Sequence, residues 1–473
     1  MMKAWYTVAR IVKKTFAYSD QAVVSGTNFL VGIMLARTLG MDAYGTFVLG
    51  WMAVLFASSI QQAIILNPLY TLLPKKSSES NLIASEERTK QSQDSGRLLH
   101  SVRNDEAEKF KGGIVAMQLA LTVLTIIVGY ASIPAIRYYL PSETSTEFLI
   151  ALPLVMGAYV TQDFLRRMLF VEGKANMALV GDIVAYGFQI PILGALWFTG
   201  MLSLNSALIV IGSCFSASTL VNLFTLNFEP VKQLNLVTRG SLLATLKECW
   251  TFSKYLVATS LLQWFSGNAF IVVAGGIIGP AAVGAVRIAQ NVMGVLHVLF
   301  LALENTVPIK AAQLLKEKGE VGLMGFMKQI TTNAGLVTLA VAGSVAVFAT
   351  PILGFLYGPE YVGYNDVLAA FAALYLLIFL GTVLRFAIRT LEKNQYIFIT
   401  YVLTTIFSVF CAEPIVEAFG IYGILLGLFG VHAITLIVFV VSLWSEIKLM
   451  FGLTAENAKF SQSAQSLMPG IEK

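Results

Sequence analysis

Residues 365–388 read NDVLAAFAALYLLIFLGTVLRFAI, and no charged side chain occurs between Val367 and Leu384. A helix needs about 20 predominantly apolar residues to cross the hydrocarbon core of a bilayer. Similar stretches recur along the 473-residue chain, which is 56% hydrophobic and 12% charged and has a mean hydropathy of +0.74. A soluble protein of this length could not bury that much apolar surface in one core. We therefore expect an all-α integral membrane protein.

Polar breaks between the apolar runs predict about twelve transmembrane helices. Their expected ranges are 21–39, 44–73, 113–139, 147–169, 177–199, 205–227, 254–277, 283–306, 332–356, 365–388, 396–413 and 421–444. Of the 32 Lys and Arg residues, all except Arg37, Arg137 and Arg287 then fall at the termini, in alternate loops or at the span ends that border those loops. Cytoplasmic loops are enriched in Lys and Arg. This asymmetry predicts a multi-pass protein of the cell membrane with both termini in the cytoplasm.

The two halves of the chain contain corresponding motifs. GMDAYG at 40–45 separates the first two spans, and GPAAVG at 279–284 separates spans seven and eight. With six spans in each half, the halves keep the same orientation, as in transporters built from parallel repeats. The predicted segments are the N-terminus 1–20, a six-helix bundle 21–227 with a loop at 74–112, a linker 228–253 with an amphipathic helix, a second six-helix bundle 254–444, and a tail 445–473.

The segment 75–112 is the one long stretch with a soluble composition, rich in Ser, Glu, Lys, Arg and Asp. Such a composition favours a solvated cytoplasmic loop, and docking of polysaccharide-synthesis proteins is the alternative. The predicted outer loops are short, which argues against an enzyme acting on an extracytoplasmic polymer. We find no phosphate-binding loop, dinucleotide glycine pattern or metal-ligand cluster, so we expect no catalytic residues, cofactor, metal or nucleic-acid partner. Cys214, Cys249 and Cys411 are expected to be buried hydrophobic residues.

Charged side chains inside spans are costly in hydrocarbon, and each is a functional candidate. Asp163 and Glu304 are the candidates for ion coupling. Asp163 lies close to Arg166 and Arg167, so an ion pair within the helix is the competing interpretation. For Glu304 and Asp182, the alternative is an interfacial position or a salt bridge to a nearby lysine.

The candidates for substrate binding are cationic or polar residues in spans one, two, seven and eight. Arg37 and Arg287 lie at corresponding edges of the two glycine motifs, and an arginine can bind phosphate through two parallel hydrogen bonds. The other candidates are Asn28, Gln62, Asn268, Asn291 and His297. In a two-lobe transporter these spans are expected to line a central cavity, with interfacial anchoring and helix–helix hydrogen bonding as alternatives.

Several motifs carry a family resemblance. They are GTNFL at 26–30, LARTLG at 35–40, YGTF at 44–47, RRMLFVEGK at 166–174 and FLYGPEY at 355–361. With these motifs, the sequence resembles the polysaccharide (O-antigen type) flippases of the multidrug, oligosaccharidyl-lipid and polysaccharide exporter superfamily. The resemblance implies two six-helix bundles around a cavity, alternating access, and outward flipping of a polyprenyl-diphosphate-linked oligosaccharide within membrane lipids. It also implies cationic residues for the diphosphate, which transfer to Arg37 and Arg287. The alternatives are a cation-coupled multidrug exporter and a membrane-embedded glycan-modifying enzyme.

Overall fold

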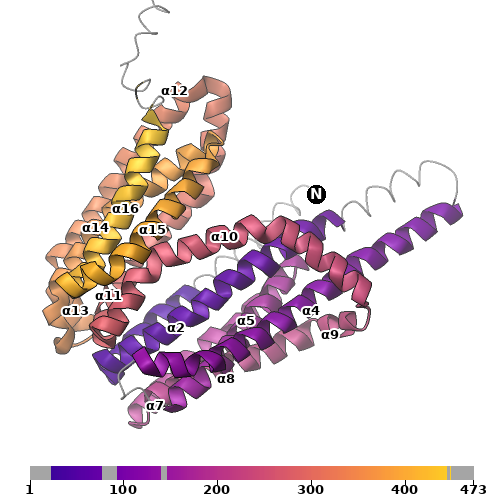
Figure 1. Cartoon of the computed structure of the whole chain (residues 1–473), viewed down its shortest axis with the longest axis horizontal. Helices are drawn as coiled ribbons and strands as arrows, with labels where there is room; N and C mark the ends of the chain where they lie inside the picture. Colours follow the sequence, from indigo (N-terminus) through magenta and orange to yellow (C-terminus); the bar gives the residue numbers. More distant parts are fainter. Residues whose placement is uncertain (1–22, 77–92, 140–145, 445–447, 449–473) are drawn as a thin grey trace, which may run out of the picture. The chain divides into compact units, whose positions relative to one another are not determined.

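The computed structural model describes residues 23–76, 93–139, 146–444 and 448 (Figure 1). Within these ranges the regular structure is entirely helical, and no residue is in a strand. Backbone polar groups have no water to bond in hydrocarbon, so a helix, which satisfies them internally, is the structure that a single apolar segment can adopt there. The all-α prediction is confirmed.

The N-terminal part is built from long apolar helices that are interrupted at two places by π-helical turns. Its elements are the helix Val23–Leu39, α2 (Met41–Gln61), the π-helix η1 (Gln62–Leu66), α4 (Gln93–Tyr139), α5 (Thr146–Val171), α6 (Ala175–Asp182), the π-helix η2 (Ile183–Gly187), α7 (Gln189–Phe198), α8 (Leu204–Thr225) and α9 (Glu229–Leu234). The helix of α2 and η1 continues to Lys76, and α6, η2 and α7 together form one span, Ala175–Phe198.

The C-terminal part begins with a long helix and ends with three helices of transmembrane length. Its elements are α10 (Arg239–Ile277), α11 (Pro280–Met293), α12 (Val295–Val347), α13 (Ala349–Leu356), the 3-10 helix η3 (Pro359–Tyr364), α14 (Asn365–Thr390), α15 (Asn394–Phe419) and α16 (Ile421–Ser442). Gly319 has a φ of 65° and divides α12 into two legs. The first leg continues α11 across Gly294, so the two helices form one span.

Ten helices among the described residues are long and apolar enough to cross a membrane. Counting both legs of α12, and adding the shorter apolar helix Val23–Leu39, gives the twelve spans that the sequence predicts. The fold class is therefore that of an integral membrane protein with two six-helix halves.

The segment 74–112 differs from its prediction as a loop. Residues 77–92 lie outside the described part, but residues 93–112 are helical and form the first part of α4. Opposite charges recur here three and four residues apart, as in Asp105 and Lys109, and such pairs support a helix in water. A composition that is too polar for a membrane span is still compatible with a helix that extends beyond it.

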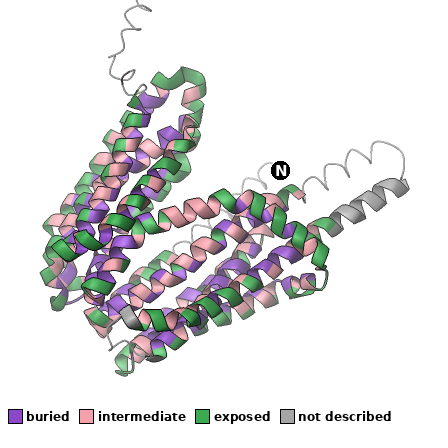
Figure 2. Cartoon of the chain, in the orientation of Figure 1, coloured by how far each residue is buried: buried purple, intermediate pink, exposed green. Residues whose placement is uncertain are grey.

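The chain divides into two compact units. Unit 1 comprises residues up to Trp264 together with Gly275–Gly284, and unit 2 comprises Phe265–Ala274 and the residues from Ala285 onward. In unit 1, α5 packs against α4 and α8, whereas in unit 2 α14 packs against α12 and α16. Figure 2 shows buried residues concentrated within each group of packed helices. The segment boundaries given above for the linker and the two bundles stay a prediction.

The two glycine motifs form a reciprocal contact within unit 1. A Cβ atom added to Gly45 would lie 1.8 Å from the Pro280 carbonyl oxygen, and one added to Gly284 would lie 3.0 Å from the Met41 carbonyl oxygen. Each contact joins the last glycine of one motif to the second residue of the other. This pseudo-symmetric contact agrees with the repeat predicted from the sequence.

Candidate functional site

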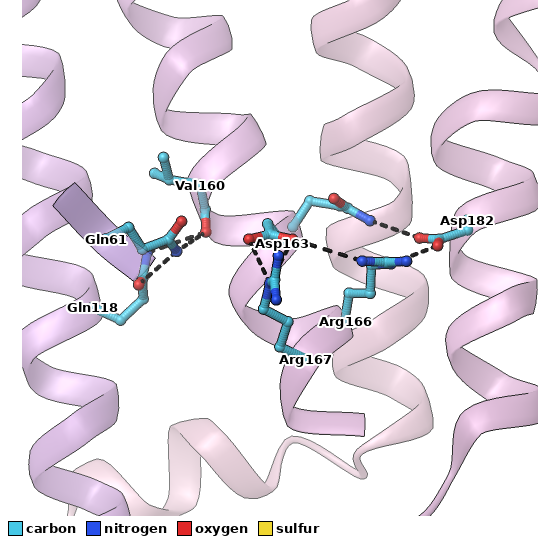
Figure 3. A network of polar contacts seen from close by, with 8 residues as sticks. Gln61, Gln118, Val160, Asp163, Arg166, Arg167 and Asp182 are labelled. Carbon is cyan, nitrogen blue, oxygen red and sulfur yellow. Dashed lines mark hydrogen bonds and ion pairs between the residues drawn. The ribbon is translucent and has the colours of Figure 1, made fainter. Parts of the chain in front are cut away.

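Four charged side chains form a buried network between α5 and α6 in unit 1 (Figure 3). Arg166 donates from Nε to Asp182 Oδ2 at 2.5 Å, and its Nη1 lies 3.9 Å from Asp163 Oδ1. Arg167 donates from Nε to both carboxylate oxygens of Asp163, at 3.0 and 2.9 Å. Two guanidinium groups thus balance two carboxylates, and the network carries no formal net charge.

The local sequence explains how the network forms. Spacings of three and four residues place Asp163, Arg166 and Arg167 on adjoining positions of one face of α5. The chain then turns at Gly173, where Lys174 donates from its backbone nitrogen to the Leu169 carbonyl, and returns along α6. Asp182 is completely buried. An ionised carboxylate at such a position requires a partner, because leaving it unpaired in a low-dielectric interior costs several kcal/mol.

Glutamine side chains extend the polar contacts to α2 and α4. Gln61 donates from Nε2 to Gln118 Oε1 at 2.9 Å and to the Val160 carbonyl at 2.5 Å, as Figure 3 shows. Gln162 donates from Nε2 to Asp182 Oδ1 at 3.2 Å. These amides connect four helices, α2, α4, α5 and α6, through buried hydrogen bonds.

Both π-helical turns of unit 1 begin next to these polar groups. Gln61 directly precedes η1, and Asp182 directly precedes η2. A π-helical turn inserts a residue into a helix and is frequently found at functional sites. The buried Oε1 atoms of Gln61 and Gln162 have no hydrogen-bond partner within the described part of the chain. The site therefore combines compensated charge with locally irregular backbone and spare acceptor capacity.

A second ion-pair cluster lies just beyond the end of α5. Glu172 accepts from Lys111 Nζ at 2.6 Å and lies 3.0 Å from Lys174 Nζ. Partial burial raises the pKa of the Glu172 carboxyl, but its hydrogen bonds and charge interactions with Lys111 and Lys174 outweigh burial and lower it below its ordinary value. This cluster joins α4, through Lys111, to the turn between α5 and α6.

The predicted ion-coupling residues have different environments. Asp163 is part of the network described above, so the ion pair within its helix, which the sequence left open, is present. Glu304 is exposed on α12 in unit 2 and has no ion pair among the described residues. The prediction that Asp182 lies at the interface or pairs with a lysine is wrong, because Asp182 is fully buried and pairs with Arg166.

The predicted substrate-binding residues are divided between the two units. Arg37, Asn28 and Gln62 are exposed on the first two helices of unit 1. The remaining four residues lie in unit 2: Asn268, Arg287, Asn291 and His297. Their binding roles stay a prediction.

Two of the unit 2 candidates have polar neighbours. Arg287 donates from Nη1 to Gln290 Oε1 at 3.2 Å. His297 Nε2 lies 3.5 Å from the Tyr375 hydroxyl, and its ring also packs edge-on against Phe300.

Sequence reasoning missed the roles of Arg166, Gln61 and Gln118. The helical spacing of Arg166 relative to Asp163 was visible in the sequence. Its shorter contact is with Asp182 on the next helix, which depends on the rotation of α6 against α5. The contact between Gln61 and Gln118 spans 57 residues of the chain and had no local signal.

Comparison with known proteins identifies the fold. No family model matches the chain, and no curated protein sequence matches it. An inward-facing multidrug resistance MATE family transporter of the MOP superfamily superposes with a TM-score of 0.63 at 16% identity, covering 92% of this chain and 95% of that one. The chain has the fold of the MOP superfamily transporters.

Two further structures share this fold. The lipid II flippase MurJ, in an inward closed conformation, gives a TM-score of 0.61 at 12% identity over 93% of this chain and 90% of that one. A MOP superfamily transporter from Pyrococcus furiosus, described as having a binding pocket of reverse polarity, gives 0.52 at 16% identity over 92% and 93%. At these identities the likeness is one of fold, and the residues of this chain must indicate its substrate.

Proposed function

We propose that this protein is a flippase of the polysaccharide type in the cytoplasmic membrane. It moves a polyprenyl-diphosphate-linked oligosaccharide outward by alternating access, for surface polysaccharide assembly. The proposal is supported by the sequence motifs, by the fold shared with multidrug transporters and a lipid II flippase, and above all by how charge is distributed in the spans.

The distribution of paired and unpaired charge is the observation that carries the proposal. Asp163 and Asp182, the carboxylates in the middle of the described spans of unit 1, are both compensated by arginine. Arg37 is exposed and has no carboxylate partner among the described residues. A cationic drug requires an available carboxylate, whereas a diphosphate requires strong cationic donors such as guanidinium groups. Arg37 thus supplies an uncompensated cationic group in unit 1, which favours an anionic substrate.

In this proposal the candidate residues have three roles. Arg37 and Arg287 bind the diphosphate at successive stages of transport. The sugar hydroxyls are bound by uncharged polar side chains, namely Asn28, Gln62, Asn268, Asn291 and His297. Asp163 takes part in ion coupling through its contact with Arg167. The helical segment 93–112 is available for polysaccharide-synthesis proteins.

Replacing Arg37 and Arg287 singly by Gln tests the proposal. Arg137, which lies in the last turn of α4, supplies the matched control Arg137→Gln. Loss of a charged hydrogen bond to the diphosphate should lower surface glycan output roughly tenfold at equal protein level, and the control should retain it. Normal output in both test variants would contradict the diphosphate-binding role.

Glu304 supports one alternative, a cation-coupled multidrug exporter. This carboxylate is exposed and has no ion pair among the described residues, so it is available to a cation. Under this alternative, Glu304→Gln abolishes efflux of a cationic dye such as ethidium, whereas Arg37→Gln does not. Under the flippase proposal, cells with and without the protein accumulate the dye equally.

A further inference from the structure

A half-buried aromatic surface lies on α2 of unit 1, next to the polar site but outside it. Trp51 stacks on Phe47, with ring centroids 6.0 Å apart and an interplanar angle of 13°. The Tyr159 ring of α5 meets Trp51 edge-on at 5.7 Å. The buried ring of Phe215 supports both Trp51 and Tyr159 from α8. Phe47, Trp51 and Tyr159 themselves remain partly exposed.

Polar groups continue this surface along the same helix face. Ser58 and Gln62 follow Trp51 by seven and eleven residues, which returns them to nearly the same side of α2. Ser58 is partly exposed and Gln62 is exposed. One turn and two turns beyond Tyr159 on α5 are Asp163 and Arg167. We call Phe47, Trp51, Ser58, Gln62 and Tyr159 the aromatic track.

The aromatic track differs from the surfaces of unit 1 that suit lipid. Between residues 119 and 128 of α4 the exposed side chains are apolar, and Leu119, Val123 and Ile127 are 45%, 55% and 58% exposed. Acyl chains solvate such a surface well. They solvate the amide of Gln62 and the hydroxyl of Ser58 poorly, because these groups would leave their hydrogen bonds to water unreplaced. The aromatic track therefore suits water or a polar ligand better than it suits lipid.

We infer that the aromatic track is a subsite for a sugar ring of the transported glycan. The apolar C–H face of a pyranose packs against the electron-rich face of an indole, and Ser58, Gln62 and the Tyr159 hydroxyl lie beside it to bind hydroxyl groups. The inference rests on the proposed flippase function and adds to it a sugar-binding element that makes no contact with the diphosphate. An apolar drug would use the rings but would leave the polar half of the track unpaired.

Binding measurements on the full chain in lipid nanodiscs test the inference. The two probes are a polyprenyl diphosphate carrying a tetrasaccharide and the same polyprenyl diphosphate without sugar. Trp51→Leu removes the ring, and we expect it to weaken binding of the glycosylated probe about two- to tenfold while leaving the bare probe unaffected. Trp51→Phe should retain most of the affinity.

The matched control uses another stacked tryptophan. Trp197 is 43% exposed and stacks on Phe198 at 5.6 Å on α7, so Trp197→Leu removes a comparable ring from a surface without the polar half. The Trp197→Leu variant should bind both probes with the affinity of the wild type. A second readout needs no variant: the glycosylated probe, but not the bare one, should protect the Trp51 indole of the wild type from hydroxyl-radical oxidation.

The outcomes separate this inference from the function on which it rests. Binding of neither probe by the wild type would overturn the flippase proposal and the inference together. In a second outcome the wild type prefers the glycosylated probe, Trp51→Leu binds that probe with the same affinity, and the probe does not protect the Trp51 indole from oxidation. This outcome would overturn the sugar subsite alone. An equal loss for both probes in Trp51→Leu would also overturn it, because the ring would then support the fold or the lipid carrier.

Discussion

The buried pair of Arg166 and Asp182 gives the strongest prediction for single residues. Arg166→Met leaves the fully buried Asp182 carboxylate without its guanidinium partner, so we expect a loss of about 3–5 kcal/mol in stability. Asp182→Asn should lower the stability less, because Arg166 can still pair with Asp163, whose carboxylate lies 3.9 Å from it in the wild type. Thermal unfolding of the purified variants shows which of the two substitutions lowers the Tm more. A lower Tm for Asp182→Asn than for Arg166→Met would contradict this account.

The cluster around Glu172 predicts a pH dependence. The pKa of this carboxyl is lower in the folded protein than its ordinary value of 4.5, because Lys111 and Lys174 outweigh burial. A carboxyl with a depressed folded-state pKa stabilises the fold above its unfolded-state pKa, and that stabilisation disappears as the pH falls through the folded-state value.

The Glu172 prediction can be measured by comparing wild type and Glu172→Gln across the acid range. The wild type should have the higher Tm near neutral pH, and the difference should shrink as the pH falls below about 4.5. The variant also controls for the other carboxylates of the protein, because they titrate in both chains. Parallel Tm profiles over this range would show that Glu172 contributes nothing to stability.

At the scale of the helices, the sequence predicts best the positions at which helices are interrupted. The glycine motifs at 40–45 and 279–284 were identified as corresponding breaks, and the structure places both at helix junctions with Gly40 and Gly279 at positive φ. The π-helical turns had no such signal. They follow Gln61 and Asp182, and an inserted residue leaves the hydrophobic pattern of a fully apolar helix unchanged. The helix over 93–112 was missed for a different reason. Its polar composition was interpreted as that of a loop, although a polar segment can also form a helix in water.

The reciprocal glycine contact gives a prediction about helix packing. Gly45→Ala places a Cβ 1.8 Å from the Pro280 carbonyl oxygen, so the backbones of α2 and α11 must separate. We expect a large fall in Tm and in glycan output. Gly284→Ala should be milder, at 3.0 Å from the Met41 oxygen. Gly194→Ala is the control: its Cβ would meet no atom within 4 Å, and Ala is favoured over Gly in a helix by about 1 kcal/mol. Equal behaviour of Gly45→Ala and Gly194→Ala would show that this contact is not required.

At the scale of the whole molecule, composition and periodicity were sufficient to predict the membrane class and the twelve spans. The bilayer imposes a length and a polarity on each span, and both are local properties of the sequence. The charge network was predicted only in part. The contact of Asp163 with its neighbours is local, whereas Gln61 meets Gln118 and Arg166 meets Asp182 through packing of separate helices. Which faces of α2 and α5 are exposed also depends on how these helices pack, and it could not be predicted from either helix alone.

The predicted arrangement of twelve spans has a direct consequence for accessibility. Lys232, an exposed residue of α9, is separated from Glu360 in η3 by three spans. Met201, which lies between α7 and α8, is separated from Glu360 by four spans. An odd number of crossings places two residues on opposite sides of the membrane, and an even number places them on the same side.

Single cysteines at these positions, in a chain whose three natural cysteines are replaced by serine, can be labelled in intact cells with a membrane-impermeant maleimide. We expect Met201→Cys and Glu360→Cys to react and Lys232→Cys to react only after lysis. Labelling of Lys232→Cys and Glu360→Cys from the same side would require one span fewer or one more between them. The second half would then no longer correspond to the first span for span, and the parallel repeat of six and six spans would be wrong.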